Sequence, residues 1–183
     1  MIVFVDCEGE PLQEFTALYV NVEKQLIVDV FHRHVCYPFT YDKDSFSRRH
    51  IHGLNRDFLS KNGLSNESVL LLHFRKWLSE RPYTCIYAHA PDKEKRFLSL
   101  PIQDVNLKPW KERIYCNSHQ IALFMKLNFV KICDVSCHAH DFVSWKVKCK
   151  QSPSETDCAK KNFSYHCSLY DCVECFLFFC NEK

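Results

Sequence analysis

The first part of the chain is dominated by apolar patterns that are typical of β-strands. Ile2 to Asp6 is a short, continuous apolar run that ends in polar residues, which predicts a buried strand. Phe15 to Val22 and Gln25 to Cys36 are rich in β-branched and aromatic residues, and Asn21 to Lys24 can form a turn between them. We therefore expect three consecutive antiparallel strands at the start of the fold.

Helical spacing becomes frequent after Pro38. Asp44 to Lys61 carries a basic face and ends at Asn62-Gly63, a pair typical of a helix C-terminus. Ser65 or Asn66 can cap a second helix that runs through Trp77. The elements expected beyond it are a strand at Tyr83 to Ala88, a helix at Pro91 to Leu100, a strand at Ile102 to Leu107, and helices at Ser118 to Leu127 and His166 to Cys180. This order predicts one α/β domain, residues 1–183, with helices flanking a mixed sheet.

Composition excludes several function classes. The chain has 183 residues, 46% of them hydrophobic, which is enough to bury a core. Only three glycines occur, so no glycine-rich phosphate loop of the P-loop or Rossmann type can be built. The chain contains 12 cysteines but shows neither a secretory signal nor an apolar stretch of membrane-spanning length. We therefore expect an intracellular protein, cytoplasmic or nuclear, with reduced thiols and no contact with a membrane.

Two acidic residues follow the first apolar run. Residues two apart along a strand face the same side, so Asp6 and Glu8 are expected to project together while Cys7 faces the other way. Two adjacent carboxylates repel each other unless a cation lies between them, and hard oxygen ligands suit Mg²⁺ or Mn²⁺. The pair alone is also compatible with a solvated strand end.

A histidine and an aspartate mark the start of the last expected helix. His166 and Asp171 are five residues apart, which predicts that His166 lies on the preceding loop or first turn and that Asp171 lies on the helix. An unperturbed histidine has a pKa near 6.5 and is therefore suited to act as a general base at neutral pH.

Taken together, four segments resemble the DEDDh 3′–5′ exonuclease superfamily, which has a ribonuclease-H-like fold. They are Asp6-x-Glu8, the His52-Gly53-Leu54 signature, the acidic stretch that follows Ala88-His89, and His166-x₄-Asp171. The resemblance covers nearly the whole chain, in the same order as in the family. It implies a ribonuclease-H-like mixed sheet with three antiparallel N-terminal strands followed by parallel strands.

The resemblance also implies a mechanism and a substrate. Two Mg²⁺ or Mn²⁺ ions about 3.5–4 Å apart would be held by Asp6, Glu8, Asp171 and an acid from the third motif. His166 would accept the proton of the attacking water. His52, Gly53 and Leu54 would seat the terminal nucleotide of a single-stranded RNA or DNA with a free 3′ end.

The third motif departs from the family pattern, which is Ala-His-Asn-Ala-x-Phe-Asp-x-x-Phe-Leu. Residues 88–98 run AHAPDKEKRFL, without a gap, so that Glu94 stands where an aspartate is expected. Asp92 lies two residues earlier and would face a different side of a helix. Register favours Glu94 as the third acid and leaves Asp92 as the alternative.

A second resemblance concerns zinc. Cys137 and His140 have a Cys-x-x-His spacing, and Cys167 directly follows His166; thiolates and imidazole suit tetrahedral Zn²⁺. The set is similar to that of the Maelstrom domain, a ribonuclease-H-like relative in which the exonuclease acids are typically lost. This resemblance implies one structural zinc on Cys137, His140 and Cys167 together with Glu94. In that case Asp92 would have to serve as the third catalytic acid.

Two functions follow from these patterns. The first is an active metal-dependent 3′–5′ exonuclease, which is favoured because an inactive site has no need for a base at the position of His166. The alternative is a catalytically weak or inactive Maelstrom-like domain that binds nucleic acid and is stabilised by zinc. A reactive thiol at Cys7 or Cys167 is disfavoured, since the sequence supplies no activating environment for either.

Overall fold

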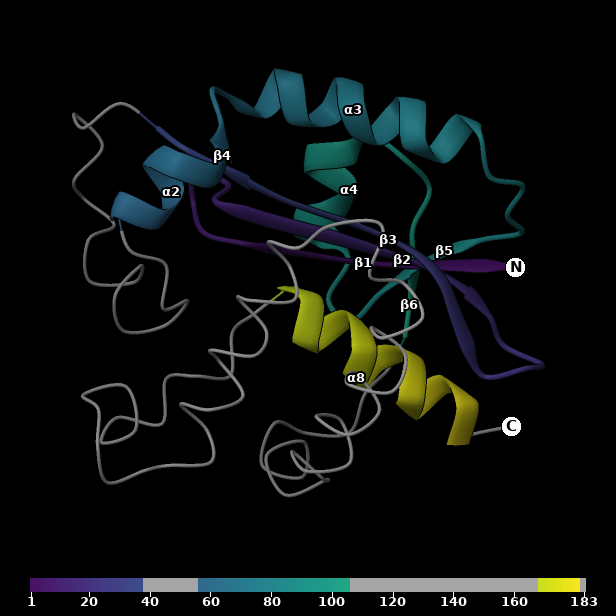
Figure 1. Ribbon diagram of the computed structural model, residues 1–183. Coiled ribbons are helices and arrows are strands. Elements are labelled where there is room, and N and C mark those ends of the chain that lie inside the picture. Colours follow the sequence, from purple (N-terminus) through teal and green to yellow (C-terminus); the bar gives the residue numbers. More distant parts are fainter. Residues whose placement is uncertain (38–55, 106–167, 182–183) are drawn as a thin grey trace, which may run out of the picture.

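The computed structural model describes residues 1–37, 56–105 and 168–181, which form an α/β arrangement around one mixed sheet (Figure 1). The order of the six strands in this part of the chain is β4-β3-β2-β1-β5-β6. The strands are β1 (Ile2–Glu8), β2 (Glu14–Asn21), β3 (Leu26–Val35), β4 (Gly63–Leu64), β5 (Ile86–Ala88) and β6 (Gln103–Asp104). The helices are α2 (Arg56–Asn62), α3 (Glu67–Ser79), α4 (Asp92–Leu98) and α8 (Ser168–Asn181).

Strand pairing confirms the expected change from antiparallel to parallel. The first three strands pair antiparallel, whereas β4 is parallel to β3, β5 to β1, and β6 to β5. The register aligns residues of β1, β2 and β3 in rows across the sheet. One row consists of Asp6, Thr16 and His32, and the next of Glu8, Glu14 and His34. Polar side chains from three strands are thus brought together at one end of the sheet.

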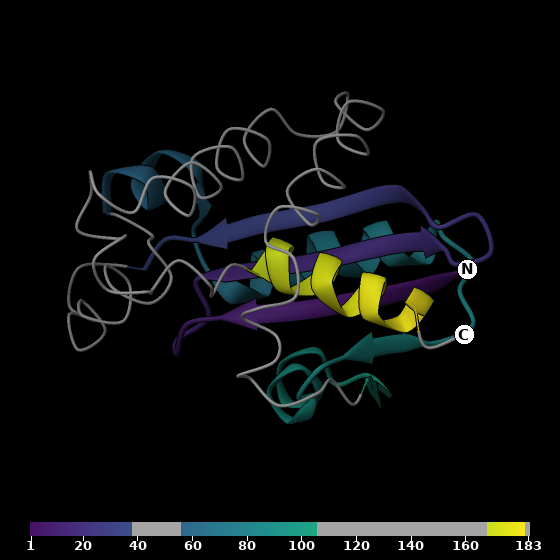
Figure 2. The same ribbon diagram turned by 90° about the horizontal axis from the view of Figure 1, so that it is seen from below.

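Helices cover both faces of the sheet (Figures 1 and 2). Helix α8 lies across β1 and β2 on one face, and α3 and α4 lie on the other. The strand β1 is central, so both of its faces are buried and its sequence is almost continuously apolar. Ile2 and Phe4 belong to the core cluster beneath α8, while Val3 and Val5 belong to the cluster beneath α3 and α4.

Helix α3 illustrates how local sequence determines an element. The side chain of Asn66 accepts a hydrogen bond from the backbone N–H of Val69 at 3.0 Å, which satisfies one of the amides left unpaired at a helix start. Leu70, Phe74 and Leu78 lie on one side of the helix and are buried. Phe74 meets Phe15 of β2 edge to face, with ring centroids 4.9 Å apart. Each such buried side chain contributes about 1.5–3 kcal/mol.

Several element boundaries differ from the sequence predictions. β1 continues to Glu8 because its backbone pairs with β2 as far as Glu14, so both acids lie within the strand. The ladder of β5 begins only at Ile86, although Thr84 and Cys85 also hydrogen-bond to the backbone at the start of the chain. Helix α8 begins at Ser168. The parts of the first and last predicted helices before residues 56 and 168, and all of the helix predicted at Ser118 to Leu127, lie outside the described residues.

No helix within residues 1–37, 56–105 and 168–181 is long and apolar enough to cross a bilayer.

Helix α2 ends at Asn62-Gly63, as the sequence context predicts, but Gly63 is also the first residue of a strand. It follows α2 directly and pairs in parallel with His34. A Cβ at this position would lie 2.6 Å from the carbonyl oxygen of Leu59 and 2.7 Å from the amide nitrogen of Cys36. Glycine is therefore required because two backbone segments approach it closely.

Gly63→Ala is expected to lower the free energy of unfolding by about 1–3 kcal/mol, the usual cost of overpacking, because backbone atoms must move to admit the methyl group. Urea denaturation followed by circular dichroism measures the change. Ser65→Ala, at a nearby exposed position, is the control and should leave the stability unchanged. Equal stability of Gly63→Ala and the unmodified protein would contradict the close approach.

Candidate metal centre

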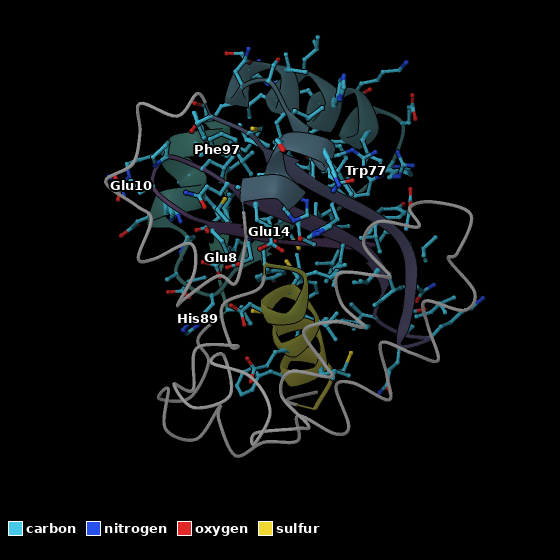
Figure 3. All side chains as sticks on the ribbon, turned by 60° about the vertical axis from the view of Figure 1, so that its left-hand side comes forward. Glu8, Glu10, Glu14, Trp77, His89 and Phe97 are labelled. Carbon is cyan, nitrogen blue, oxygen red and sulfur yellow. The ribbon has the colours of Figure 1, made fainter. Side chains whose placement is uncertain are left out.

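Three acidic side chains from opposite ends of the chain meet at the end of β1. Asp6 and Glu8 point from β1 toward α8, and Asp171 lies in the first turn of that helix. One carboxylate oxygen from each residue lies within 4.8 Å of the others. Glu8 lies beside the start of α8 (Figure 3). Such a group can provide oxygen ligands for a divalent cation.

The position of Asp171 depends on how α8 is attached to the sheet. Leu169, Cys172 and Phe176 are buried against β1 and β2. The sulfur of Cys172 lies 3.7 Å from the carbonyl oxygens of both Phe4 and Thr16, and its single S–H is shared between these two acceptors. The hydroxyl oxygens of Ser168 and Thr16 lie 2.6 Å apart in a buried hydrogen bond. These contacts hold the first turn of the helix, and therefore Asp171, over the two acids of β1.

Electrostatics at the end of β1 favour a bound cation. Burial raises the pKa of Asp6 well above its usual value, and the neighbouring carboxylates of Glu8, Asp171 and Glu94 raise it further. Lys93 acts in the opposite direction. Oδ2 of Asp6 is buried and has no hydrogen-bond partner among the described residues. Because a buried anionic group without a partner is costly, the donor set fits a hard divalent ion such as Mg²⁺ or Mn²⁺.

The two candidates for the third acid lie in different environments. Glu94 is buried, with 4% of its surface exposed, whereas Asp92 is exposed. Burial raises the pKa of Glu94, and hydrogen bonds with Cys7 oppose this rise. Cys7 points to the face of the sheet that carries α4, so Glu94 approaches β1 from the side opposite α8. It is close enough to affect the charge of Asp6 but is not one of the three clustered ligands.

Lys93 is a further charged residue at this site that the sequence analysis does not single out. Its ammonium group donates a hydrogen bond of 3.0 Å to the carbonyl oxygen of Cys7, and its charge lowers the pKa of both Asp6 and Glu94. The available signal was a lysine placed between two acids in the third motif. A cation beside carboxylates offers a contact for a phosphate group.

Other predicted site residues lie outside the described part of the chain. These are the general base His166, the substrate-seating residues His52, Gly53 and Leu54, and the zinc ligands Cys137, His140 and Cys167.

No protein-family model matches the sequence, and no curated protein matches it as a relative.

In the absence of divalent metal, Asp6→Asn is expected to raise the free energy of unfolding at neutral pH. The pKa of Asp6 is higher in the folded than in the unfolded chain. Its contribution to the free energy of unfolding is therefore fully present below the unfolded pKa of about 3.9 and is lost as pH rises through the folded pKa. The amide removes this charge while keeping the shape of the side chain. Urea denaturation in EDTA across a pH series measures the difference between the two proteins.

The difference should disappear below the unfolded pKa, where Asp6 is protonated in both states. Glu10→Gln is the matched control, because Glu10 follows the same strand but is exposed (Figure 3). If Asp6→Asn were no more stable than the unmodified protein at neutral pH, this would contradict a raised pKa of Asp6 in the folded protein.

Proposed function

We propose that the chain is a metal-dependent 3′–5′ exonuclease of the DEDDh type, which hydrolyses phosphodiester bonds of single-stranded RNA or DNA. The observation that carries the proposal is the meeting of Asp6, Glu8 and Asp171 within 4.8 Å, although nearly the whole sequence separates the first from the last. Carboxylates that repel one another are gathered at a buried site where a divalent cation would neutralise them.

The arrangement of the sheet supports this proposal. Three antiparallel N-terminal strands are followed by parallel strands, as expected for a ribonuclease-H-like fold. The acids of β1 lie in the central part of the sheet and the last acid lies on a C-terminal helix packed against it. The sheet order and the positions of Asp6, Glu8 and Asp171 therefore agree with what the resemblance implies for these elements.

Asp6, Glu8 and Asp171 are the residues that would hold Mg²⁺ or Mn²⁺. When bound, two such ions would supply an activated water and stabilisation of the leaving oxygen. The chain itself contributes rigid placement, because two ligands lie on a paired central strand and the third lies on a helix with a buried face. Glu94 adds negative charge from the opposite face of the sheet.

The remaining roles concern the substrate and the proton. In this proposal Lys93, whose ammonium group hydrogen-bonds to the carbonyl oxygen of Cys7, attracts a phosphate group toward the acids. In this proposal His166 accepts a proton from the attacking water, since histidine changes its charge near neutral pH. His52, Gly53 and Leu54 seat the 3′-terminal nucleotide. A single strand is expected because its end must reach carboxylates that are buried or half-buried.

The position of Glu94 favours one alternative. Because Glu94 interacts with Cys7 and stands apart from the three clustered ligands, the acidic set is less complete than in the DEDDh pattern. The alternative is a weak or inactive Maelstrom-like domain that binds nucleic acid and is stabilised by zinc. Binding without cleavage would distinguish it from the enzyme.

In the presence of Mn²⁺ or Mg²⁺, a single-stranded oligonucleotide with a 3′ label is expected to lose that label first. The same oligonucleotide with a 5′ label should shorten stepwise. RNA and DNA are compared in parallel by gel electrophoresis. EDTA should stop the reaction. Asp6→Ala should lower the rate by about 100-fold or more, because even residues that only support metal ligands cost about 10–100-fold.

Glu10→Gln is the control for charge near the site, and its rate should equal that of the unmodified protein. Tight binding of the oligonucleotide with no metal-dependent loss of label would contradict the enzymatic proposal and support the binding domain.

The third acid is tested by comparing Glu94→Gln with Asp92→Asn. Glu94→Gln is expected to lower the rate by about 10–100-fold, because it removes a buried carboxylate whose negative charge, felt at Asp6, helps to attract the cations. Asp92→Asn should leave the rate unchanged, because Asp92 is exposed. Steady-state rates with the labelled oligonucleotide measure both, and circular dichroism checks folding. The opposite order of effects would assign the role to Asp92.

A further inference from the structure

A second group of ligand side chains lies beside the acidic centre. Glu14, His32 and His34 each place a ligand atom within 4.8 Å of those of the other two. Nε2 of His32 is 3.7 Å from Oε1 of Glu14, and Nε2 of His34 is 3.9 Å from the same oxygen. The exposed fractions of Glu14, His32 and His34 are only 0%, 4% and 3%. Neither the Mg²⁺ or Mn²⁺ site nor the zinc site predicted from the sequence includes any of these three residues.

Strand register creates this group. His32 and His34 are two residues apart on β3 and therefore face the same side of the sheet. Glu14 of β2 is the direct cross-strand partner of His34, and Thr16 is that of His32. The two imidazole rings meet edge to face with centroids 4.7 Å apart. The ligands therefore project from two paired strands, which provide a rigid base.

A hydrogen bond orients one of the imidazoles. Oγ1 of Thr16 lies 2.6 Å from Nδ1 of His32 and also 2.6 Å from Oγ of Ser168. When Nδ1–H donates to Thr16, the lone pair of Nε2 points toward Glu14. Histidines that bind metals usually donate their other ring N–H to a nearby acceptor in this way, because the bond fixes the tautomer and the ring orientation.

The distances are close to those that a metal requires. Ligand bonds of about 2.0–2.2 Å in a tetrahedral zinc site place donor atoms roughly 3.4 Å apart. The two nitrogen–oxygen distances exceed this value by only a few tenths of an ångström. Small side-chain rotations would bring both histidines and the carboxylate onto one ion.

We propose that Glu14, His32 and His34 bind one transition-metal dication of the zinc class. Two imidazoles and one carboxylate form a softer ligand set than the carboxylates of the acidic centre, so this site should prefer Zn²⁺ to Mg²⁺. Glu14 pairs with Glu8 of β1, and neighbouring strands are about 4.8 Å apart, so the two centres are adjacent. The ion would brace β2 and β3 and, through Thr16 and Ser168, the start of the helix that carries Asp171.

The test measures binding of Zn²⁺ and Co²⁺ to the EDTA-treated full chain by isothermal titration and absorption spectroscopy. The double substitution His32→Asn with His34→Asn should weaken zinc binding at this site by more than about 100-fold, because loss of ligands costs more than loss of their supporting groups. Glu14→Gln, a substitution of the same size, should weaken it at least about tenfold. Cobalt bound here gives visible d–d bands without a thiolate-to-cobalt charge-transfer band, which separates it from any cysteine site.

Two matched variants locate the metal. Cys137→Ser with His140→Asn removes predicted ligands of a cysteine site, and Glu8→Gln removes a ligand of the acidic centre. Both variants should keep the zinc affinity and the thiolate-free cobalt bands. Zinc binding and cobalt bands that are identical in the double histidine variant and the unmodified protein would overturn the proposal.

A measurement on the unmodified protein covers the case in which the histidine variants do not fold. In nuclear magnetic resonance spectra of the ¹⁵N-labelled protein, one equivalent of Zn²⁺ should shift the imidazole signals of two histidines that are protected from solvent. Mg²⁺ should not shift these signals. The proposal is overturned if Zn²⁺ shifts no such pair. Neither readout depends on nuclease activity, so failure of this site and failure of the proposed function are distinguishable.

Discussion

Electrostatic repulsion among carboxylates at the end of the central strand is the constraint on which the rest of this structure depends. The pairing of β1 fixes Asp6, and α8 then brings Asp171 toward it although both groups are acidic. Burial of Leu169 and Phe176 favours the docked helix, at about 1.5–3 kcal/mol for each side chain. Hydrophobic packing therefore assembles a site that its own charges oppose, and a bound divalent ion would relieve that opposition.

The sheet links this acidic centre to the histidine group beside it. Both lie on the face covered by α8, in the two rows of residues that cross β1, β2 and β3. Thr16 is the connecting residue, since its hydroxyl contacts both His32 and Ser168. Paired backbone and one short hydrogen-bonded chain therefore connect the two centres. Harder ligands lie on β1 and softer ligands on β3, so the two proposed sites would select different metals.

Much of this architecture could be predicted because its signals are local. Apolar periodicity identifies the strands, and a period of two places Asp6 and Glu8 on one face. The histidine group could not be found in this way, because cross-strand register, and not spacing along the chain, brings His32 and His34 to Glu14. The sequence likewise predicts the helix end at Asn62-Gly63 but not the close approach that requires the glycine, because the backbone at Cys36 that crowds it belongs to a different segment.

The packing of α8 across β1 and β2 affects how the protein emerges from the ribosome. β1 is synthesised long before the helix that covers it, because the other described strands and helices lie between them in the sequence. Until α8 leaves the ribosome, Phe4 and Leu18 cannot be buried against it. The nascent chain then exposes hydrophobic surface that chaperones or other nascent chains can bind. Translation that stops early leaves a fragment with this surface uncovered, which makes it a target for quality control.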